Sequence, residues 1–325
     1  MTSFADDRTR RSRAHSWVHW LAFIVAAFTL VLLSVGGHVT TVDAGDTEPA
    51  WSLRFWDWFV PWTQLEGGHF YEMFHRQLGT IVGFLAIAMA AILWKFEKRK
   101  WLRYTGYIAL VLIILQGLLG GLRVLVVSDV DVQQAVMRIT GVDEAIVLRV
   151  VSGMVHGSLG VILFAMMAVI ATASSKRWDV PPVSARSALT GTLRRLGVLT
   201  TLVVFLQVVL GAYLRHSGWH TGVIILHAAV ALLVGFYAVI ILYRSGDLGP
   251  EVRNIRVPAF ALAMVLQVQI FLGIHSFMVP SVTAVRTLHQ IVGAILFALC
   301  VILTVRAYHV LEPHEPREIA PEGLS

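Results

Sequence analysis

The chain alternates long apolar runs with short polar segments, and eight of the runs are about 20 residues long. A run of that length is enough to cross the ~30 Å hydrocarbon core of a bilayer as a helix. The runs are continuously hydrophobic, whereas strands of a membrane barrel alternate polar and apolar residues in shorter segments. The pattern therefore predicts an all-α integral membrane protein with eight transmembrane helices. They lie near residues 18–40, 71–94, 104–127, 150–173, 195–214, 221–243, 257–278 and 285–308.

Charged residues make up only 14% of the chain, whereas a soluble protein carries roughly 25%. Nineteen of the 26 Lys and Arg residues fall in the N-terminal tail, in alternate connections and near the C-terminus. Because basic loops stay on the cytoplasmic side, we predict a multi-pass inner (plasma) membrane protein with both termini cytoplasmic. Topology thus explains the net charge of +6, which does not indicate nucleic-acid binding. The nineteen are Arg8, Arg10, Arg11, Arg13, Lys95, Lys98, Arg99, Lys100, Arg103, Lys176, Arg177, Arg186, Arg194, Arg195, Arg244, Arg253, Arg256, Arg306 and Arg317.

A short pattern recurs at the outer ends of the predicted helices. Three odd-numbered helices carry a glutamine followed four residues later by a glycine, and the first has a weaker version that ends at Gly36. Each even-numbered helix then begins with a histidine. The unit is a helical hairpin used four times, which predicts two pseudo-symmetric four-helix bundles, residues 1–178 and 190–325. The pairs are Gln116 and Gly120, Gln207 and Gly211, and Gln269 and Gly273; the histidines are His75, His156, His227 and His289.

The four histidines indicate a function rather than four separate structural roles, since ionisable residues inside a membrane are costly. Counting about five residues into each helix places them about 7–10 Å below the outer edge. Four residues beyond each histidine, on the same helix face, a small residue leaves room for a broad planar ring. Paired imidazoles on facing helices are an ordinary way to hold heme iron. The small residues are Gly79, Gly160, Ala231 and Gly293.

Glu72 breaks the fourfold pattern. It lies three residues before His75, and the equivalent positions hold Gly153, Ile224 and Arg286. Two roles explain it equally well: an acid that interacts with the helix macrodipole, and a base or water-orienting group beside a bound macrocycle. If both halves bind porphyrin, only the first half has an acidic side chain beside its histidines that could take part in a reaction. We then expect the first half to hold the substrate and the second a permanent redox cofactor.

Several other outer residues have two interpretations. The tryptophans of the connection 41–70 suit the headgroup belt, but this loop could also form a lid over a site in the first half. Outer arginines could bind heme propionates or snorkel to the interface, and the three glutamines could bind a propionate or bridge helices. The remaining outer histidines are expected to be interfacial. The arginines are Arg76, Arg123, Arg149, Arg215 and Arg286, and the histidines are His38, His69, His216, His220 and His275.

Four stretches carry a family resemblance: GGHFYEMFHRQLGTIVG, QGLLGGLRV with MVHGSLG, QVVLGAYLRHSG with LHAAVA, and FLGIHS with VRTLHQIVGAILF. Together they resemble the heme A synthase family over nearly the whole chain. The most specific elements are Glu-x-x-His-Arg at 72–76 and Thr-Leu-His-Gln at 287–290. Members of that family are oxidoreductases that convert the C8 methyl of heme O to the formyl group of heme A, for delivery to terminal oxidases.

The resemblance implies a role for each of the five residues singled out above. His75 and His156 would flank the iron of the substrate heme O, and Glu72 matches the family's essential acid. His227 and His289 match the two axial iron ligands of a heme b cofactor. The resemblance also places the chain in membrane lipid. It leaves room for a heme O synthase, the terminal oxidase assembly and a second copy of the chain as partners.

The chain departs from the family in its cysteines. Many bacterial relatives carry cysteine pairs in outer loops, whereas Cys300 is the single cysteine here and lies in the last apolar run. An intrachain disulfide, a cysteine metal site and a thiol–disulfide step are thereby excluded. Residues 43–52 look like a diverged form of the family's first outer loop.

Two other classes of function remain open at this stage. One is a bis-histidine membrane cytochrome b that transfers electrons, for instance with a quinol, without modifying heme. All four equivalent histidines lie toward one face, which counts against a transmembrane electron wire. The other is a transporter or assembly scaffold built from paired repeats.

Overall fold

Eight long helices dominate the computed structural model, which describes residues 3–45, 47, 54–141, 145–178, 183–248 and 252–314. Within these residues, all eight helices are long and apolar enough to cross a membrane. The predicted fold class, an all-α integral membrane protein with eight spans, is therefore confirmed. Most helices extend past the predicted apolar runs, because polar residues continue them beyond the hydrocarbon region. The helices are α1 (Ser3–Thr41), α2 (Gly67–Phe96), α3 (Lys100–Ser128), α5 (Ala145–Ala173), α6 (Ser187–Ser217), α7 (Thr221–Gly246), α8 (Arg253–Met278) and α9 (Thr283–Val310).

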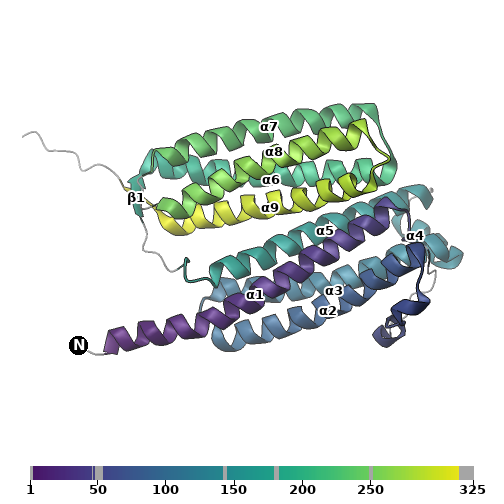
Figure 1. Ribbon diagram of the computed structural model, residues 1–325, viewed down its shortest axis with the longest axis horizontal. Coiled ribbons are helices and arrows are strands. Elements are labelled where there is room, and N and C mark those ends of the chain that lie inside the picture. Colours follow the sequence, from purple (N-terminus) through teal and green to yellow (C-terminus); the bar gives the residue numbers. More distant parts are fainter. Residues whose placement is uncertain are drawn as a thin grey trace, which may run out of the picture.

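The helices form two bundles of four that lie side by side (Figure 1). One bundle contains α1, α2, α3 and α5, and the other contains α6, α7, α8 and α9. Across their boundary, α1 and α5 pack against α6 and α9. Leu33, Val161 and Phe164 of the first bundle belong to the apolar core of the second, so the boundary is a packed interface. The pseudo-symmetry is visible in these contacts, since α1 and α5 correspond to α6 and α9 in the repeat.

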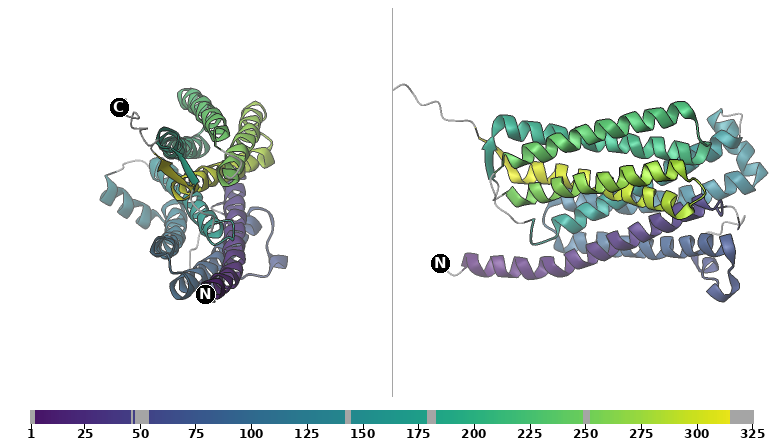
Figure 2. Two further views of the ribbon diagram at one scale, coloured as in Figure 1. Left: turned by 90° about the vertical axis from the view of Figure 1, so that its left-hand side faces the viewer. Right: turned by 45° about the horizontal axis from the view of Figure 1, so that its top comes forward.

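The two ends of the molecule differ in structure. α1 begins at the end where the strand β1 lies, and the short helix α4 (Val130–Thr140) lies at the opposite end (Figures 1 and 2). The carboxylate of Asp129 caps α4 by accepting the backbone N–H groups of Asp131 and Val132 at 3.0 and 3.1 Å. Gly141 ends it in the left-handed region at φ 69°, a conformation that glycine adopts at little cost. The predicted spans leave α4 inside the connection between the third and fourth transmembrane helices, so the apolar pattern did not predict it.

A pair of short parallel strands ties the connection between the bundles to the end of α9. Val183 of β1 (Val183–Arg186) stands opposite Leu311 of β2 (Leu311–His314). The guanidinium of Arg194 on α6 also donates to the carbonyl oxygen of Leu311 at 2.5 Å. The apolar pattern gave no sign of this pair, because two segments of four residues are too short to show strand alternation.

Candidate functional site

The structure brings the four repeated histidines together as two pairs. His75 on α2 faces His156 on α5, with ring centroids 6.5 Å apart and planes at 74°. His227 on α7 faces His289 on α9, with ring centroids 6.4 Å apart and planes at 64°. Each pair joins the even-numbered helices of two neighbouring hairpins. The two bundles therefore hold nearly identical imidazole pairs.

The spacing of the rings fits a metal ion bound from both sides. An imidazole nitrogen binds a first-row metal at about 2 Å, and the ring centroid lies about 1 Å further, so two opposed ligands place centroids about 6 Å apart. Among the described residues, no cluster of three or more His, Cys, Asp or Glu side chains could hold a metal ion. A set of two imidazoles suits a metal that brings its other ligands with it, as porphyrin iron does.

The ring nitrogens also leave hydrogen-bonding capacity unused. No hydrogen bond of normal geometry reaches Nδ1 of the four histidines among the described residues, although backbone groups of Leu32 and Gln269 lie near His75 and His289. A buried polar atom left unpaired costs about 1–3 kcal/mol, so one such atom in every repeat is unusual for a purely structural role. The pairs therefore fit the heme iron that the sequence analysis expected on three grounds: spacing, donor type and unused polar atoms.

Each imidazole packs against a glycine of the preceding long helix. A Cβ atom added at Gly36 would lie 2.6 Å from Cε1 of His75, and one at Gly273 would lie 3.0 Å from Cε1 of His289. The corresponding distances are 3.4 Å from Gly120 to His156 and 3.5 Å from Gly211 to His227. The repeated glycine therefore provides the space that each histidine ring occupies.

Two of the four small residues that follow the histidines face glutamine side chains. Nε2 of Gln116 and of Gln269 lies 3.1 Å from the Cβ positions of Gly160 and Gly293, so glutamine side chains fill those two spaces. Nε2 of Gln116 donates to the carbonyl oxygen of His156 at 2.8 Å. Gln207 makes the same bond to His227, also at 2.8 Å. The glutamines thus bridge helices, one of the two roles considered for them. At Gly79, the atom nearest to the Cβ position is 4.0 Å away, on Leu32.

The histidines lie at different distances from the starts of their helices in the two halves. His227 and His289 lie six residues after the first residues of α7 and α9, about 9 Å along the axis. His75 and His156 lie eight and eleven residues into α2 and α5, which corresponds to about 12 and 16 Å. The helices of the first half begin four and five residues before the predicted spans, at Gly67 and Ala145, and the depth of the histidines below the membrane edge stays a prediction.

Glu72 lies buried beside the first pair, with only 4% of its surface exposed. One carboxylate oxygen accepts from Arg76 at 2.7 Å, and the other accepts from the hydroxyl of Thr47 at 2.6 Å. Thr47 belongs to the first outer loop, so this part of the loop covers the carboxylate. Glu72 is five residues past the start of α2, and macrodipole effects fall off within the first turn. The burial and the ion pair therefore favour a local chemical role over a macrodipole role.

Comparison with known proteins identifies the family. The model of the COX15-CtaA family, described as cytochrome oxidase assembly protein, matches residues 19–222. The chain belongs to this family. The match confirms the resemblance found in the sequence, and it includes Glu72, His75 and His156 but ends before His227. No curated protein gave a match.

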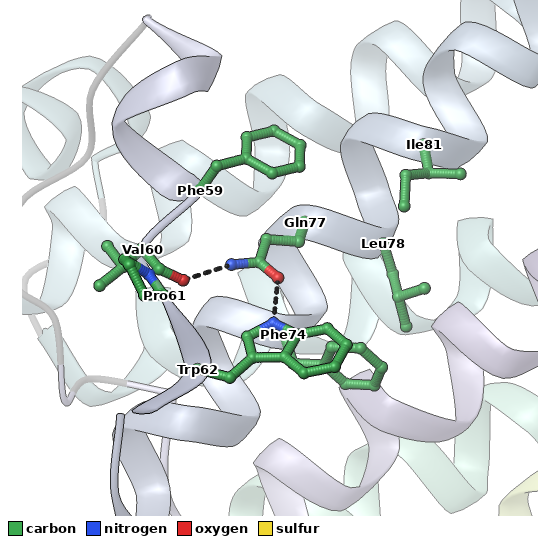
Figure 3. A pocket seen from close by; sticks show the side chains of 8 residues that line it. All are labelled: Phe59, Val60, Pro61, Trp62, Phe74, Gln77, Leu78 and Ile81. Carbon is green, nitrogen blue, oxygen red and sulfur yellow. Dashed lines mark hydrogen bonds between the residues drawn. The ribbon is translucent and has the colours of Figure 1, made fainter. Parts of the chain in front are cut away.

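The tryptophan-rich part of the connection before α2, residues 54–66, lies against the side of that helix. In Figure 3, the side-chain amide of Gln77 connects this loop to the helix. It accepts from the indole N–H of Trp62 at 2.9 Å and donates to the carbonyl oxygens of Trp58 and Val60. The loop and α2 line a pocket of about 400 Å³ that does not include His75.

The described tryptophans of this loop match the headgroup-belt interpretation. Trp56 and Trp62 are 59% and 60% exposed, and amphipathic indoles favour the membrane interface. Trp51 lies outside the described residues. Thr47 is the described residue of the connection that bonds to the carboxylate of the first site.

Sequence reasoning missed the contacts across the bundle boundary. His216 was expected to be an interfacial residue, but its ring packs on α5, where a Cβ atom at Gly153 would lie 2.6 Å from its Cε1 atom. Gly153 occupies the position that Glu72 holds in the first repeat. A glycine at that equivalent position was the one available signal that a neighbouring side chain needs the space.

The arginines near the outer ends have distinct surroundings. Arg215 donates to Gln290 and to the carbonyl oxygen of Gly37 at 2.5 Å, and also to the hydroxyl of Thr41. Arg286 donates to the carbonyl oxygen of Pro280 at 3.5 Å. Among the propionate candidates, Arg76 is therefore engaged by an acid and Arg215 by a network that joins α6 to α1 and α9.

The buried ion pair gives a stability prediction. Replacing Arg76 with glutamine leaves the Glu72 carboxylate buried without that positive charge, which should lower the free energy of unfolding by about 3 kcal/mol. The double variant Glu72→Gln, Arg76→Gln removes both charges at similar volume and should recover most of the loss. Denaturation of the purified protein in detergent measures both effects. Losses that simply add would contradict a direct coupling between the two side chains.

Proposed function

We propose that this protein is a heme A synthase, an oxidoreductase that converts the C8 methyl of heme O to a formyl group. The observation that carries the proposal is the asymmetry between two otherwise equivalent imidazole pairs. Only the pair in the first bundle has a buried carboxylate, Glu72, one helical turn from a histidine. Membership of a cytochrome oxidase assembly family supports it.

The two pairs would serve two different hemes. His75 and His156 would flank the iron of the substrate heme O, and His227 and His289 would be the axial ligands of a resident heme b. Heme b, when bound, supplies one-electron transfer. Ring separations of 6.5 and 6.4 Å suit both assignments. The bundle from α1 to α5 is then the substrate half and the bundle from α6 to α9 the cofactor half.

Glu72 would act on the water that supplies the oxygen atom. An ionised carboxylate only accepts hydrogen bonds, and a positioned carboxylate can take a proton from water. Arg76 and Thr47 fix its two oxygens, so its orientation does not depend on bulk water. Each of two successive hydroxylations takes one water and releases two protons and two electrons, and the electrons would pass to an external one-electron acceptor. The twice-hydroxylated carbon then loses water to become the formyl group.

Removing the carboxylate should stop product formation without removing the cofactor. In cells that also make heme O, Glu72→Gln should yield heme O or a hydroxylated intermediate in place of heme A. Pigment extraction followed by mass analysis distinguishes these compounds. Glu66→Gln is the matched control, since Glu66 is an exposed acid at the N-terminus of the same helix. Normal heme A output from Glu72→Gln would remove this residue from the mechanism. Absence of heme A from the wild type, with bound heme, would favour an electron-transferring cytochrome b.

The resident heme should depend on the second pair only. His227→Ala and His289→Ala are each expected to lose the absorption spectrum of bound heme b, because one axial ligand is missing. His75→Ala and His156→Ala should retain it. Spectra of the four purified variants, normalised to protein, make the comparison. Equal loss in all four would contradict the division into a substrate half and a cofactor half.

The proposed orientation places the histidine pairs toward the outside of the plasma membrane. A cysteine introduced at Arg138 on α4 should then react with an impermeant maleimide in intact cells, whereas one at Lys98 should not. Both positions are exposed, and the native Cys300 is buried, so the two variants differ in sidedness. Labelling of Lys98→Cys alone would reverse the assignment.

A further inference from the structure

Positive charge gathers at the outer boundary between the two bundles. Arg123 near the end of α3, Arg149 near the start of α5 and Arg215 near the end of α6 all lie toward the same end of the molecule as α4. Two acidic side chains near these arginines, among the described residues, are Asp43 and Glu72. Asp43 lies 3.7 Å from Arg149 with its side chain 90% exposed, and Glu72 is bonded to Arg76. Such a concentration of cations beside a lipid-embedded site favours an anionic ligand.

His216 reaches this cluster from the second bundle. Its ring lies on Gly153, three residues before His156 on α5, where no side chain larger than hydrogen fits without moving it. Its neighbour Arg215 points the other way and bonds to Gly37 on α1 and Gln290 on α9. The anchored arginine therefore fixes the end of α6 so that His216 enters the first-bundle site.

Arg123 reaches the same place from the first bundle. It lies three residues after Gly120 on α3, one helical turn from the glycine that packs against His156. Gly45 of the first outer loop lies directly over its guanidinium, where a Cβ atom would be 2.7 Å from a terminal nitrogen. Arg123 has no hydrogen-bond or ion-pair partner among the described residues. It is thus a confined cation whose donors are available to a ligand.

We propose that Arg123 and His216 form a carboxylate-binding subsite of the first-bundle site, built jointly by the two bundles. This inference rests on the proposed function, since the ligand would be a propionate of the tetrapyrrole substrate. A guanidinium binds a carboxylate through two parallel hydrogen bonds, and an imidazole N–H can add a third. Glu72 would then face the reacting part of the ring, and Arg123 with His216 would hold its carboxylate edge.

The test measures how much the free carboxylates of a porphyrin contribute to its binding affinity, and it does not depend on catalytic turnover. Zinc protoporphyrin IX and its dimethyl ester are titrated into purified protein in detergent, and binding is followed by porphyrin fluorescence. The wild type should bind the diacid about 10-fold or more tightly than the ester. Arg123→Gln should lose most of this preference while its affinity for the ester stays unchanged, and Arg123→Lys should keep part of it.

Two variants test the contribution of the second bundle. His216→Gln removes the imidazole, and Gly153→Ala displaces it without removing it, so both should reduce the preference for the diacid. Arg138→Gln is the matched control, because it removes an exposed outer arginine that lies on α4. The heme b spectrum of each variant reports whether the second bundle is intact.

The possible outcomes separate the two proposals. A wild type that prefers the diacid, with the same preference in Arg123→Gln and His216→Gln, would overturn the subsite. So would equal affinity of the wild type for diacid and ester, or a preference abolished by added phosphatidylglycerol, which would assign the cations to a lipid phosphate. A wild type that binds neither porphyrin would contradict the proposed function itself.

Discussion

The close approach of neighbouring helices at a glycine is the constraint on which the rest of this structure depends. Inside a bilayer no water is available to satisfy a polar side chain, so an imidazole there must lie within the protein. Gly36, Gly120, Gly211 and Gly273 each give one histidine ring the room to do so. The rings of neighbouring hairpins then converge in pairs at separations of 6.5 and 6.4 Å. An added Cβ at Gly36 or Gly273 would press on the facing ring, whereas one at Gly120 or Gly211 would make ordinary van der Waals contact with it.

The residues that differ between the repeats distinguish the surroundings of the histidine pairs in the two bundles. The histidine, the glycine and the glutamine recur with little change. Glu72 occurs once, and the equivalent position in the second hairpin is Gly153, which accepts His216 from the other bundle. The same position of the repeat therefore holds a carboxylate in the first hairpin, whereas in the second it is a glycine that makes room for His216. Both changes fall at the first-bundle site, where the proposed chemistry occurs.

The sequence predicted most of the fold because length and hydrophobicity decide it in a membrane. The eight helices follow from the need to satisfy backbone groups across the bilayer. The pairing of His75 with His156 and of His227 with His289 could be expected from the repeat. The contacts of Arg215 and His216 could not, because they depend on how two bundles dock. Helix α4 and the strand pair were also missed, since short elements at the membrane surface carry weak patterns.

The parallel pairing of β1 with β2 has a consequence for the order of assembly. β1 precedes α6, whereas β2 follows α9, so the strand beside the inter-bundle connection has no partner until the last membrane segment has been synthesised. During translation the first four spans can insert and pack while the later ones are still emerging. The pairing of β1 with β2 is therefore a late event in biogenesis, because it cannot occur before α9 has been synthesised.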